Sequence, residues 1–216
     1  MYVCFEGIDG CGKSTQISLL NEHFERLGYK TVIAKHPGFT PFGSELRNLI
    51  LHGSQPECDL AHRLLFWADA VETAKYWNEV KDDDIILIMD RRVELSNWAY
   101  GYALYKTGKT DHKYVNLHAK LSELLKIEPG GLGFTFILDV PVDIAFQRIK
   151  QRGKELTIIE QRGKRYFEIV RSAYRAAHLQ LLPRSVWLDG TKPIDQIHNE
   201  ILEWFEHAVT WEGEEQ

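Results

Sequence analysis

A loop near the N-terminus has the composition of a phosphate-binding site. Residues 7–14 read GIDGCGKS and match the pattern G-x-x-x-x-G-K-[ST]. The loop follows an apolar run typical of a strand and precedes a segment with helical spacing, which is the context that this motif requires. Glycines let consecutive backbone N–H groups turn toward a phosphate, and the N-terminus of the following helix adds a partial positive charge. The loop therefore predicts a site for a nucleoside triphosphate.

Two side chains of this loop add chemistry to the backbone. We expect Lys13 to reach the terminal phosphates and the Ser14 hydroxyl to ligate Mg²⁺. A glycine turn before a helix can also arise by chance, but the flanking patterns argue against that interpretation. Cys11 has no predicted redox role, because its position only requires a small side chain. The residues predicted to bind ATP here are Gly7, Ile8, Asp9, Gly10, Cys11, Gly12, Lys13, Ser14 and Thr15.

Such a loop occurs in kinases, in GTPase switches and in motor-like ATPases. A GTPase usually carries an N-K-x-D guanine-binding motif, and the nearest segment here, TKPID at 191–195, lacks the asparagine and has different spacing. Motor ATPases usually need a longer chain than 216 residues. A small phosphotransferase therefore fits best.

A second charged segment follows another apolar run. Residues 89–103 read MDRRVELSNWAYGYA, so Asp90 stands at the end of a predicted strand with Arg91 beside it. We expect Asp90 to hold Mg²⁺ through water or to organise Ser14, and Arg91 to bind an anionic acceptor. The alternative is a salt bridge at the end of the strand, without a role in binding.

Five apolar runs must position these residues. They are 1–7, 30–36, 84–90, 134–140 and 185–190, and each is rich in branched and aromatic residues and precedes a segment with helical spacing. Between the first two runs, Ile17, Leu20, Phe24 and Leu27 share one helix face, and Gly28 ends that helix. The pattern predicts an α/β fold with a parallel sheet covered on both faces. In such sheets ligands bind beyond the carboxyl ends of the strands.

Composition limits the remaining possibilities. A chain of 216 residues predicts one domain, spanning 1–216. The net charge of -5 argues against nucleic acid as a general partner, because binding it requires a basic surface. Three irregularly spaced cysteines suggest reduced thiols without a disulfide framework or a zinc site. Neither a signal peptide nor a membrane span is visible, so we expect a cytoplasmic protein without a membrane partner.

Six segments in order resemble the thymidylate kinase family over nearly the whole chain. FEGIDGCGKSTQ at 5–16 matches the family's opening, and HPGFTPFGSELR at 36–47 resembles R-E-P-G-G-T-P. RLLFWADA at 63–70 resembles L-L-F-A-A-D-R, and the segment from Asp90 resembles D-R-Y-x-D-S-S. Residues 138–153 and 166–174 resemble the segments before and after the family's lid.

The resemblance implies a P-loop NTPase fold with five parallel strands, a mobile lid at about 150–163 and a homodimer. It implies transfer of the γ-phosphate of ATP to a deoxynucleoside monophosphate, usually dTMP, by positioning and electrostatics without a covalent intermediate. The acceptor-binding residues that it implies are Asp9, Pro37, Phe39, Arg47, Phe66, Arg91, Ser96, Asn97 and Tyr100. Arg148 and Arg152 would clamp the transferring phosphates, and Thr191, Lys192 and Pro193 would flank adenine.

Two of these assignments have a simpler interpretation. Phe66 would stack on the acceptor base, but an aromatic residue on an apolar helix can also be an ordinary core residue. Arg148 and Arg152 can equally form a solvated basic face of their helix. Both alternatives stay open at the level of the sequence.

The chain departs from the family at several positions. The arginine that binds thymine falls on Ala70, and the glutamate of R-E-P falls on His36. The lid's D-R-x-E reads TIIE at 157–160, so Arg152, Arg162 or Lys164 must supply the lid charge. The loop has Gly10 where some relatives place an arginine. We therefore keep open a different, broader or modified deoxynucleotide acceptor such as a modified pyrimidine monophosphate, a P-loop kinase with a non-nucleotide acceptor, and a nucleotide-binding protein without catalysis.

Overall fold

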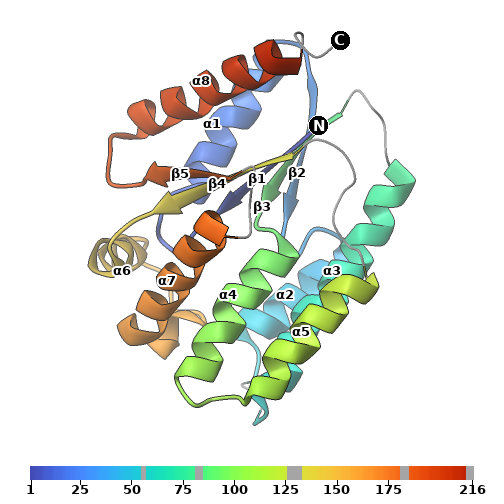
Figure 1. Ribbon diagram of the computed structural model, residues 1–216, viewed down its shortest axis with the longest axis vertical. Helices are drawn as coiled ribbons and strands as arrows, with labels where there is room; N and C mark the ends of the chain where they lie inside the picture. The colour runs from blue at the N-terminus through green and yellow to red at the C-terminus, as the bar shows by residue number, and fades with distance from the viewer. Residues whose placement is uncertain (55–56, 81–84, 126–132, 181–184, 213–216) are drawn as a thin grey trace.

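The computed structural model describes residues 1–54, 57–80, 85–125, 133–180 and 185–212 (Figure 1). The strands are β1 (Tyr2–Glu6), β2 (Lys30–Lys35), β3 (Ile85–Asp90), β4 (Gly133–Asp139) and β5 (Ser185–Asp189). The helices are α1 (Lys13–Arg26), α2 (Pro41–His52), α3 (Asp59–Val80), α4 (Val93–Lys106), α5 (His112–Leu125), α6 (Val142–Gln151), α7 (Lys164–Gln180) and α8 (Ile194–Glu212), with the 3-10 turn η1 (Glu160–Arg162). In this described part of the chain, no helix combines the length and the apolar character needed to cross a membrane.

The strands form one parallel sheet in the order β2-β3-β1-β4-β5. The predicted five-stranded parallel sheet is confirmed, and each predicted apolar run lies on one of its strands. β1 stands at the centre, with Phe5 beside Asp90 of β3 and beside Phe136 of β4. The chain crosses from β1 toward β2 on one side and later reaches β4 on the other. The order therefore reverses at the carboxyl end of β1, which is where parallel sheets bind ligands.

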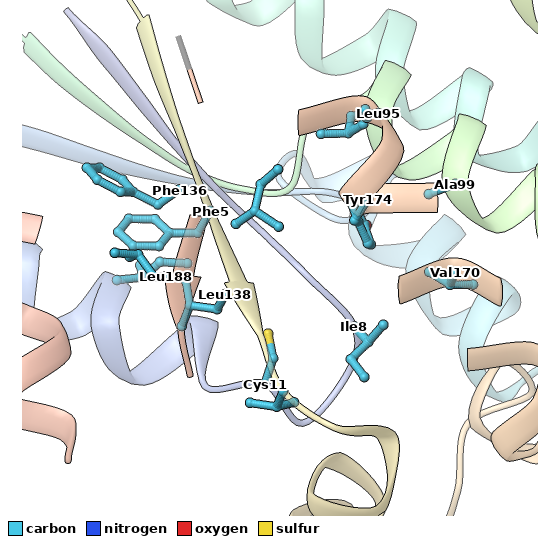
Figure 2. Close-up of a cluster of buried hydrophobic side chains, with 14 of the residues drawn as sticks. Phe5, Ile8, Cys11, Leu95, Ala99, Phe136, Leu138, Val170, Tyr174 and Leu188 are labelled. Atoms are coloured by element: carbon cyan, nitrogen blue, oxygen red, sulfur yellow. The ribbon is translucent and has the colours of Figure 1, made fainter. Parts of the chain in front are cut away.

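Helices cover both faces of the sheet, because the strands are apolar on both sides. α1 and α8 lie against one face, and α4 and α7 lie against the other, with α2, α3 and α5 packed beyond α4 (Figure 1). Phe24 of α1 and Phe205 of α8 pack with ring centroids 5.3 Å apart. Figure 2 shows Phe5 and Phe136 close together on the strands, with Tyr174 of α7 farther along the core. The sheet is thus a rigid frame for the loops at its edge.

The first helix begins in a way that leaves backbone donors open. Its N-cap is Gly12, with φ 107°, and no side chain caps the helix at this end. The N–H groups of the first turn are therefore not satisfied by a local side chain, and they point toward the loop before the helix. The other end follows the prediction, since Gly28 comes directly after the C-cap Leu27 and has φ 86°. Such an open helix N-terminus favours an anion.

We predict that Phe136→Ala lowers the free energy of unfolding by about 3–5 kcal/mol. Phe136 is 1% exposed, and the rings of Phe5 and Phe205 lie 5.5 and 5.8 Å away, so truncation leaves a cavity in the centre of the sheet. Urea denaturation measures the change. The control is Leu124→Ala, at a side chain that is 77% exposed, and it should stay within about 0.5 kcal/mol of the wild type. A loss below about 1 kcal/mol for Phe136→Ala would contradict this description of the core.

Candidate active site

A cavity of about 440 Å³ lies where β1 and β3 end. The phosphate loop lines it with Asp9, Gly10, Gly12, Lys13, Ser14 and Thr15. The segments after β2 and β3 and the helices α2, α3 and α4 line it with Lys35, His36, Pro37, Arg47, Leu51, Arg63, Phe66, Asp90, Arg91, Ser96 and Tyr100. Residues at and after the end of α6 complete it with Arg148, Arg152, Thr157, Ile159 and Glu160. One cavity thus joins residues predicted to bind the donor with residues predicted to bind the acceptor.

The phosphate loop keeps its shape through two glycines at close contacts. Gly7 has φ 132°, and a Cβ there would lie 2.4 Å from the Leu138 carbonyl oxygen. Gly10 has φ 82°, and a Cβ there would lie 2.5 Å from the Ala145 carbonyl oxygen. Both positions therefore require glycine, and the loop fits tightly between β4 and α6. The arginine that some relatives carry at position 10 has no room in this loop.

Lys13 lies inside the turn of the loop. Its Nζ donates to the carbonyl oxygens of Gly7 and Ile8 at 3.0 and 3.1 Å, and it lies 3.5 Å from Cys11 Sγ. Lys13 is buried at the beginning of α1, and it lines the cavity. Its ammonium group and the open helix N-terminus therefore add positive charge at the same point, which suits a polyphosphate.

Arg91 connects the loop to the rest of the site. It has φ 86° and is the one non-glycine residue with positive φ in the described ranges, a strained conformation that a dense set of contacts must hold. Its Nη2 contacts Asp9 Oδ1 at 2.5 Å and Tyr100 OH at 3.1 Å, and its Nη1 donates to the Gly7 carbonyl at 3.1 Å. Burial alone would lower the pKa of Arg91, but Tyr100, Tyr174, Asp9 and Glu6 raise it well above its usual value. The guanidinium thus stays charged and aims Asp9 at the cavity.

Glu6 lies beneath this arginine and is fully buried. Its carboxylate accepts hydrogen bonds from the Arg92 backbone N–H at 2.8 Å, Tyr174 OH at 2.8 Å and Ser96 Oγ at 3.0 Å. Burial raises the pKa of Glu6, while Arg91 and the hydrogen bond from Tyr174 oppose that rise. Glu6 was not predicted from the sequence, because an acid inside an apolar run does not reveal its partners.

Asp90 and Ser14 have the chemistry of magnesium ligands. Asp90 Oδ1 is buried and has no hydrogen-bond partner in the described structure, and Ser14 is exposed where the loop meets the cavity. An acid with an unused buried oxygen beside a phosphate loop fits a hard cation that takes oxygen ligands. No group of three or more His, Cys, Asp or Glu that could hold a metal occurs in the searched, described residues. The protein would therefore supply few ligands, as is usual for Mg²⁺ bound with phosphates. The alternative prediction is a salt bridge at the end of this strand. Arg91 does form an ion pair, but with Asp9 of the phosphate loop.

Three cations gather on the acceptor side of the cavity. Burial and the neighbouring Arg47 lower the pKa of Lys35, and burial lowers the pKa of Arg47. The charge of Arg91 lowers both pKa values further, while Asp90 opposes these shifts. Arg47 Nη1 also donates to the Pro37 carbonyl at 2.6 Å. Positive groups held close enough to repel one another are poised for a dianion such as a phosphate monoester. Lys35 was not among the predicted site residues, although its basic side chain ends β2 in the segment compared with R-E-P.

Phe66, which the resemblance predicts to stack on the acceptor base, has a second side chain against one face of its ring. Phe66 lines the cavity, and the guanidinium carbon of Arg63 lies 4.3 Å from the centre of its ring. Arg63 is 2% exposed, and its Nη2 contacts Asn97 Oδ1 at 2.5 Å. Arg63 was not predicted either, since its spacing on α3 shows a charged residue within an apolar helix but not the ring that it covers. Phe66 is thus held from one face, whichever of its two interpretations applies.

Several predicted site residues lie away from this cavity, as far as the described residues define it. Asn97 is buried behind Arg63, and Phe39 packs against Tyr76 with ring centroids 5.1 Å apart. Residues 191–193, predicted to flank adenine, also do not line the cavity. The adjacent Gly190 is nevertheless close to the phosphate loop: a Cβ built on it would lie 3.1 Å from the Cys11 carbonyl oxygen. The turn before α8 therefore borders the phosphate loop from outside the cavity.

The segment after α6 closes one side of the cavity. Arg148 donates to the carbonyl oxygens of Cys11 and Gly190 at 3.3 and 3.0 Å, so it lies beside the phosphate loop. Arg152 Nη2 contacts both carboxylate oxygens of Glu160 at 2.9 Å. Glu160 also accepts from the Thr157 N–H, and Thr157 Oγ1 accepts from the Glu160 N–H, which is a capping box. The segment compared with D-R-x-E is therefore a structured turn built on Glu160.

This turn is docked on the helices beside it. The Ile158 N–H donates to the Leu51 carbonyl at the end of α2, at 3.1 Å. Arg162 pairs with Asp59 at the start of α3, and Lys164 pairs with Asp143. Of the three residues considered for the lid charge, Arg152 lines the cavity, while Arg162 and Lys164 are engaged elsewhere in this conformation.

We predict that Glu6→Gln changes how stability varies with pH. Because burial raises the pKa of Glu6 from about 4.5, its contribution to the free energy of unfolding is full below that pH and is lost as the pH rises through the folded pKa. The wild-type value minus the Glu6→Gln value should therefore fall as the pH rises from about 4.5. Chemical denaturation from about pH 4 to pH 8 measures it. Glu203→Gln, at an exposed position on α8, is the control. A difference that is constant or rises with pH is the opposite result.

The comparisons with known proteins agree with this geometry. The family model described as thymidylate kinase matches residues 5–201. A thymidylate kinase from Fervidobacterium nodosum is 33% identical over 209 residues, which cover 95% of this chain and 98% of that protein. The solved thymidylate kinase from Ehrlichia chaffeensis superposes with a TM-score of 0.69 at 26% identity, covering 95% of this chain and 98% of that one. The thymidylate kinase structure from Candida albicans gives 0.73 at 22% identity, covering 96% and 92%. The chain belongs to the thymidylate kinase family.

Proposed function

We propose that the protein transfers the γ-phosphate of ATP to dTMP, forming ADP and dTDP. The observation that carries the proposal is the single cavity shared by the phosphate loop, the cations Lys35, Arg47 and Arg91, and the aromatic Phe66. A donor and an acceptor bound in one cavity can align for in-line transfer. The relatives named thymidylate kinase support dTMP as the acceptor.

The donor end would act mainly through positive charge. The N–H groups of the loop, Lys13 and Arg148 surround the place of the terminal phosphates. Charge spreads over the equatorial oxygens during phosphoryl transfer, so fixed cations and dipoles there stabilise the transition state more than the ground state. Ser14 and Asp90 would hold Mg²⁺, which when bound neutralises phosphate charge and orients the phosphates. No residue needs to form a covalent bond with the phosphoryl group.

The acceptor end would position the monophosphate. Lys35, Arg47 and Arg91 would bind its phosphate, and Asp9, held by Arg91, would approach the sugar hydroxyl. Phe66 would stack on the base. Arg47, Arg91, Asp9 and Phe66 are each held by a contact within the protein, so little of their side-chain entropy is lost on binding. The turn at 157–160 and Arg152 would close over the phosphates and exclude water, which limits ATP hydrolysis.

Three further expectations belong to the proposal. The exposed faces of α2 and α3 carry the large apolar side chains Phe42, Leu49, Leu64 and Val71, which are 42–51% exposed. Such a surface supports the homodimer that the family resemblance implies. The three cysteines are unpaired, which suits a cytoplasmic location. The acidic net charge supports nucleotides rather than nucleic acid as partners.

Formation of ADP from ATP, Mg²⁺ and a panel of monophosphates tests the proposed function. The proposal predicts turnover with dTMP. Turnover with another or a modified deoxynucleoside monophosphate in preference to dTMP would favour the broader-acceptor hypothesis, which the alanine at position 70 motivates. Nucleotide binding without turnover of any acceptor would favour a binding protein without catalysis.

Lys13→Ala should reduce the turnover number by about 10²-fold or more while the protein stays folded. The reason is the loss of the ammonium group that lies within the turn of the phosphate loop. Coupled detection of ADP gives the rate, and thermal unfolding reports the folded state. Lys109→Ala, at an exposed position after α4, is the control and should keep wild-type turnover. Unchanged turnover in folded Lys13→Ala protein would exclude the phosphate-binding role.

Val71→Asp should convert a dimer into a monomer. A carboxylate at this 44% exposed position would be buried and unpaired in an interface built on α3. Light scattering coupled to size-exclusion chromatography measures the mass of both proteins. Leu179→Asp, on the exposed face of α7, makes the same kind of change elsewhere and should leave the mass unaltered. A dimer that persists in Val71→Asp would place the interface on another surface.

A further inference from the structure

A buried histidine stands beside the aromatic ring at the acceptor end of the cavity. His36 is 5% exposed and lines the cavity, and its ring centroid lies 6.1 Å from that of Phe66. The proposed function gives His36 no part, because neither the phosphates nor the sugar hydroxyl needs it. Any role of His36 in the reaction therefore rests on that proposed function and concerns the base of the acceptor.

The hydrogen bonds of Asp69 fix the tautomer of the neutral His36 ring. Asp69 is fully buried on α3, and its Oδ1 accepts from the Gly38 backbone N–H at 2.9 Å. Its Oδ2 lies 2.6 Å from His36 Nδ1. A carboxylate can only accept hydrogen bonds, so Nδ1 carries the proton and donates it to Asp69. In the neutral ring, Nε2 then presents a lone pair.

Nε2 is the part of this arrangement that lacks a partner. It is buried, and it makes no hydrogen bond to any of the described residues. A buried polar atom without a partner is unfavourable, and such atoms call for an explanation in a ligand or a bound water. A ligand group that donates a hydrogen bond to Nε2 would satisfy it.

The neighbours of Phe66 limit where a base can stack beside His36. Arg63 covers one face of Phe66, with its guanidinium carbon 4.3 Å from the ring centre. A base that stacks on Phe66 would therefore use the other face of the ring, and the His36 ring centroid lies 6.1 Å from that of Phe66. Position 70 offers no alternative contact, because Ala70 is 1% exposed and packs with Trp67 and Val93 in an apolar cluster. His36 Nε2 is thus a polar atom beside Phe66 whose hydrogen-bonding capacity the described residues leave unused.

We propose that His36 Nε2 accepts a hydrogen bond from the acceptor base and thereby determines which base is phosphorylated, with Asp69 as the positioning residue that fixes its tautomer. The ligand class is a pyrimidine deoxynucleoside monophosphate with an N–H or O–H donor on the edge that faces His36. A base with a lone pair at that place is rejected, because two acceptors would then face each other in a buried site.

The test exploits the polarity of the pair. In Asp69→Asn, the new Oδ1 still accepts from the Gly38 N–H, so the amide NH₂ faces His36 Nδ1 and moves the ring proton to Nε2. Uracil and cytosine carry opposite donors and acceptors at N3 and at C4. We compare kcat/KM for dUMP with kcat/KM for dCMP. Whether N3 or the group at C4 faces His36, the variant should shift this ratio by about tenfold or more away from the substrate that the wild type prefers.

His36→Phe is the second variant and keeps the ring while removing the nitrogen atoms. We expect it to reduce kcat/KM for the best substrate among dTMP, dUMP, dCMP and 5-hydroxymethyl-dUMP by about tenfold, and to change the poorest by about twofold or less. His178→Phe removes a histidine of α7 that bonds to Ser185, away from the cavity, and should preserve the selectivity. Thermal unfolding confirms that each variant is folded.

The outcomes separate the two proposals. Turnover by the wild type with dTMP upholds the proposed function, and turnover with another of the four in preference to dTMP upholds its broader-acceptor form; in either case altered ratios in the variants uphold the role of His36. Equal factors for all four substrates in His36→Phe, or a wild type that does not discriminate among them, would overturn that role while the kinase function stands. A wild type that phosphorylates none of them overturns both. If Asp69→Asn does not fold, the result for His36→Phe decides alone.

Discussion

The buried guanidinium of Arg91 is the contact on which the arrangement of the site depends. It joins the carboxyl end of β3 to the phosphate loop through Gly7 and Asp9, and to the helices through Tyr100 and Tyr174. A charge at this depth is tolerated because carboxylates and hydroxyl groups surround it. The same contacts hold its backbone at positive φ. The residues proposed to bind the donor and the acceptor therefore share one frame of buried contacts, and a displacement of either end would disturb the other.

The sheet explains why this frame lies at one edge. Because β1 lies between β3 and β4, the loop after β1 and the segment after β3 leave the sheet side by side. Glu6, the last residue of β1, lies under Arg91 and accepts the backbone N–H of Arg92. The central strand thus carries both the beginning of the phosphate loop and the acid that anchors the acceptor side.

Apolar periodicity and the glycines that end elements predicted the fold well. They predicted the site only where its residues lie in one short segment of the chain. The strands and helix α1 follow from apolar runs, and the phosphate loop from glycines whose places the structure explains by contacts under 3 Å. The remaining site depends on partners far apart in the chain: Asp69 stands 33 residues after His36, and Arg63 stands 34 before Asn97. No local pattern encodes such pairs. Asn97 illustrates this, since its motif suggested the base while its side chain holds Arg63.

The role proposed for His36 and Asp69 would let a chain of this family change its recognition of a base without changing its frame. At position 70 the side chain is small, and Trp67 and Val93 fill the surroundings, so a polar group there would lie in an apolar cluster. The chain instead places a polar atom directly after the end of β2 and orients it with an aspartate of α3. Since Asp69 also holds the Gly38 N–H, the turn after β2 and the state of Nε2 are set by one carboxylate. Under the role proposed for His36, base selectivity and the shape of this turn would therefore be coupled through Asp69.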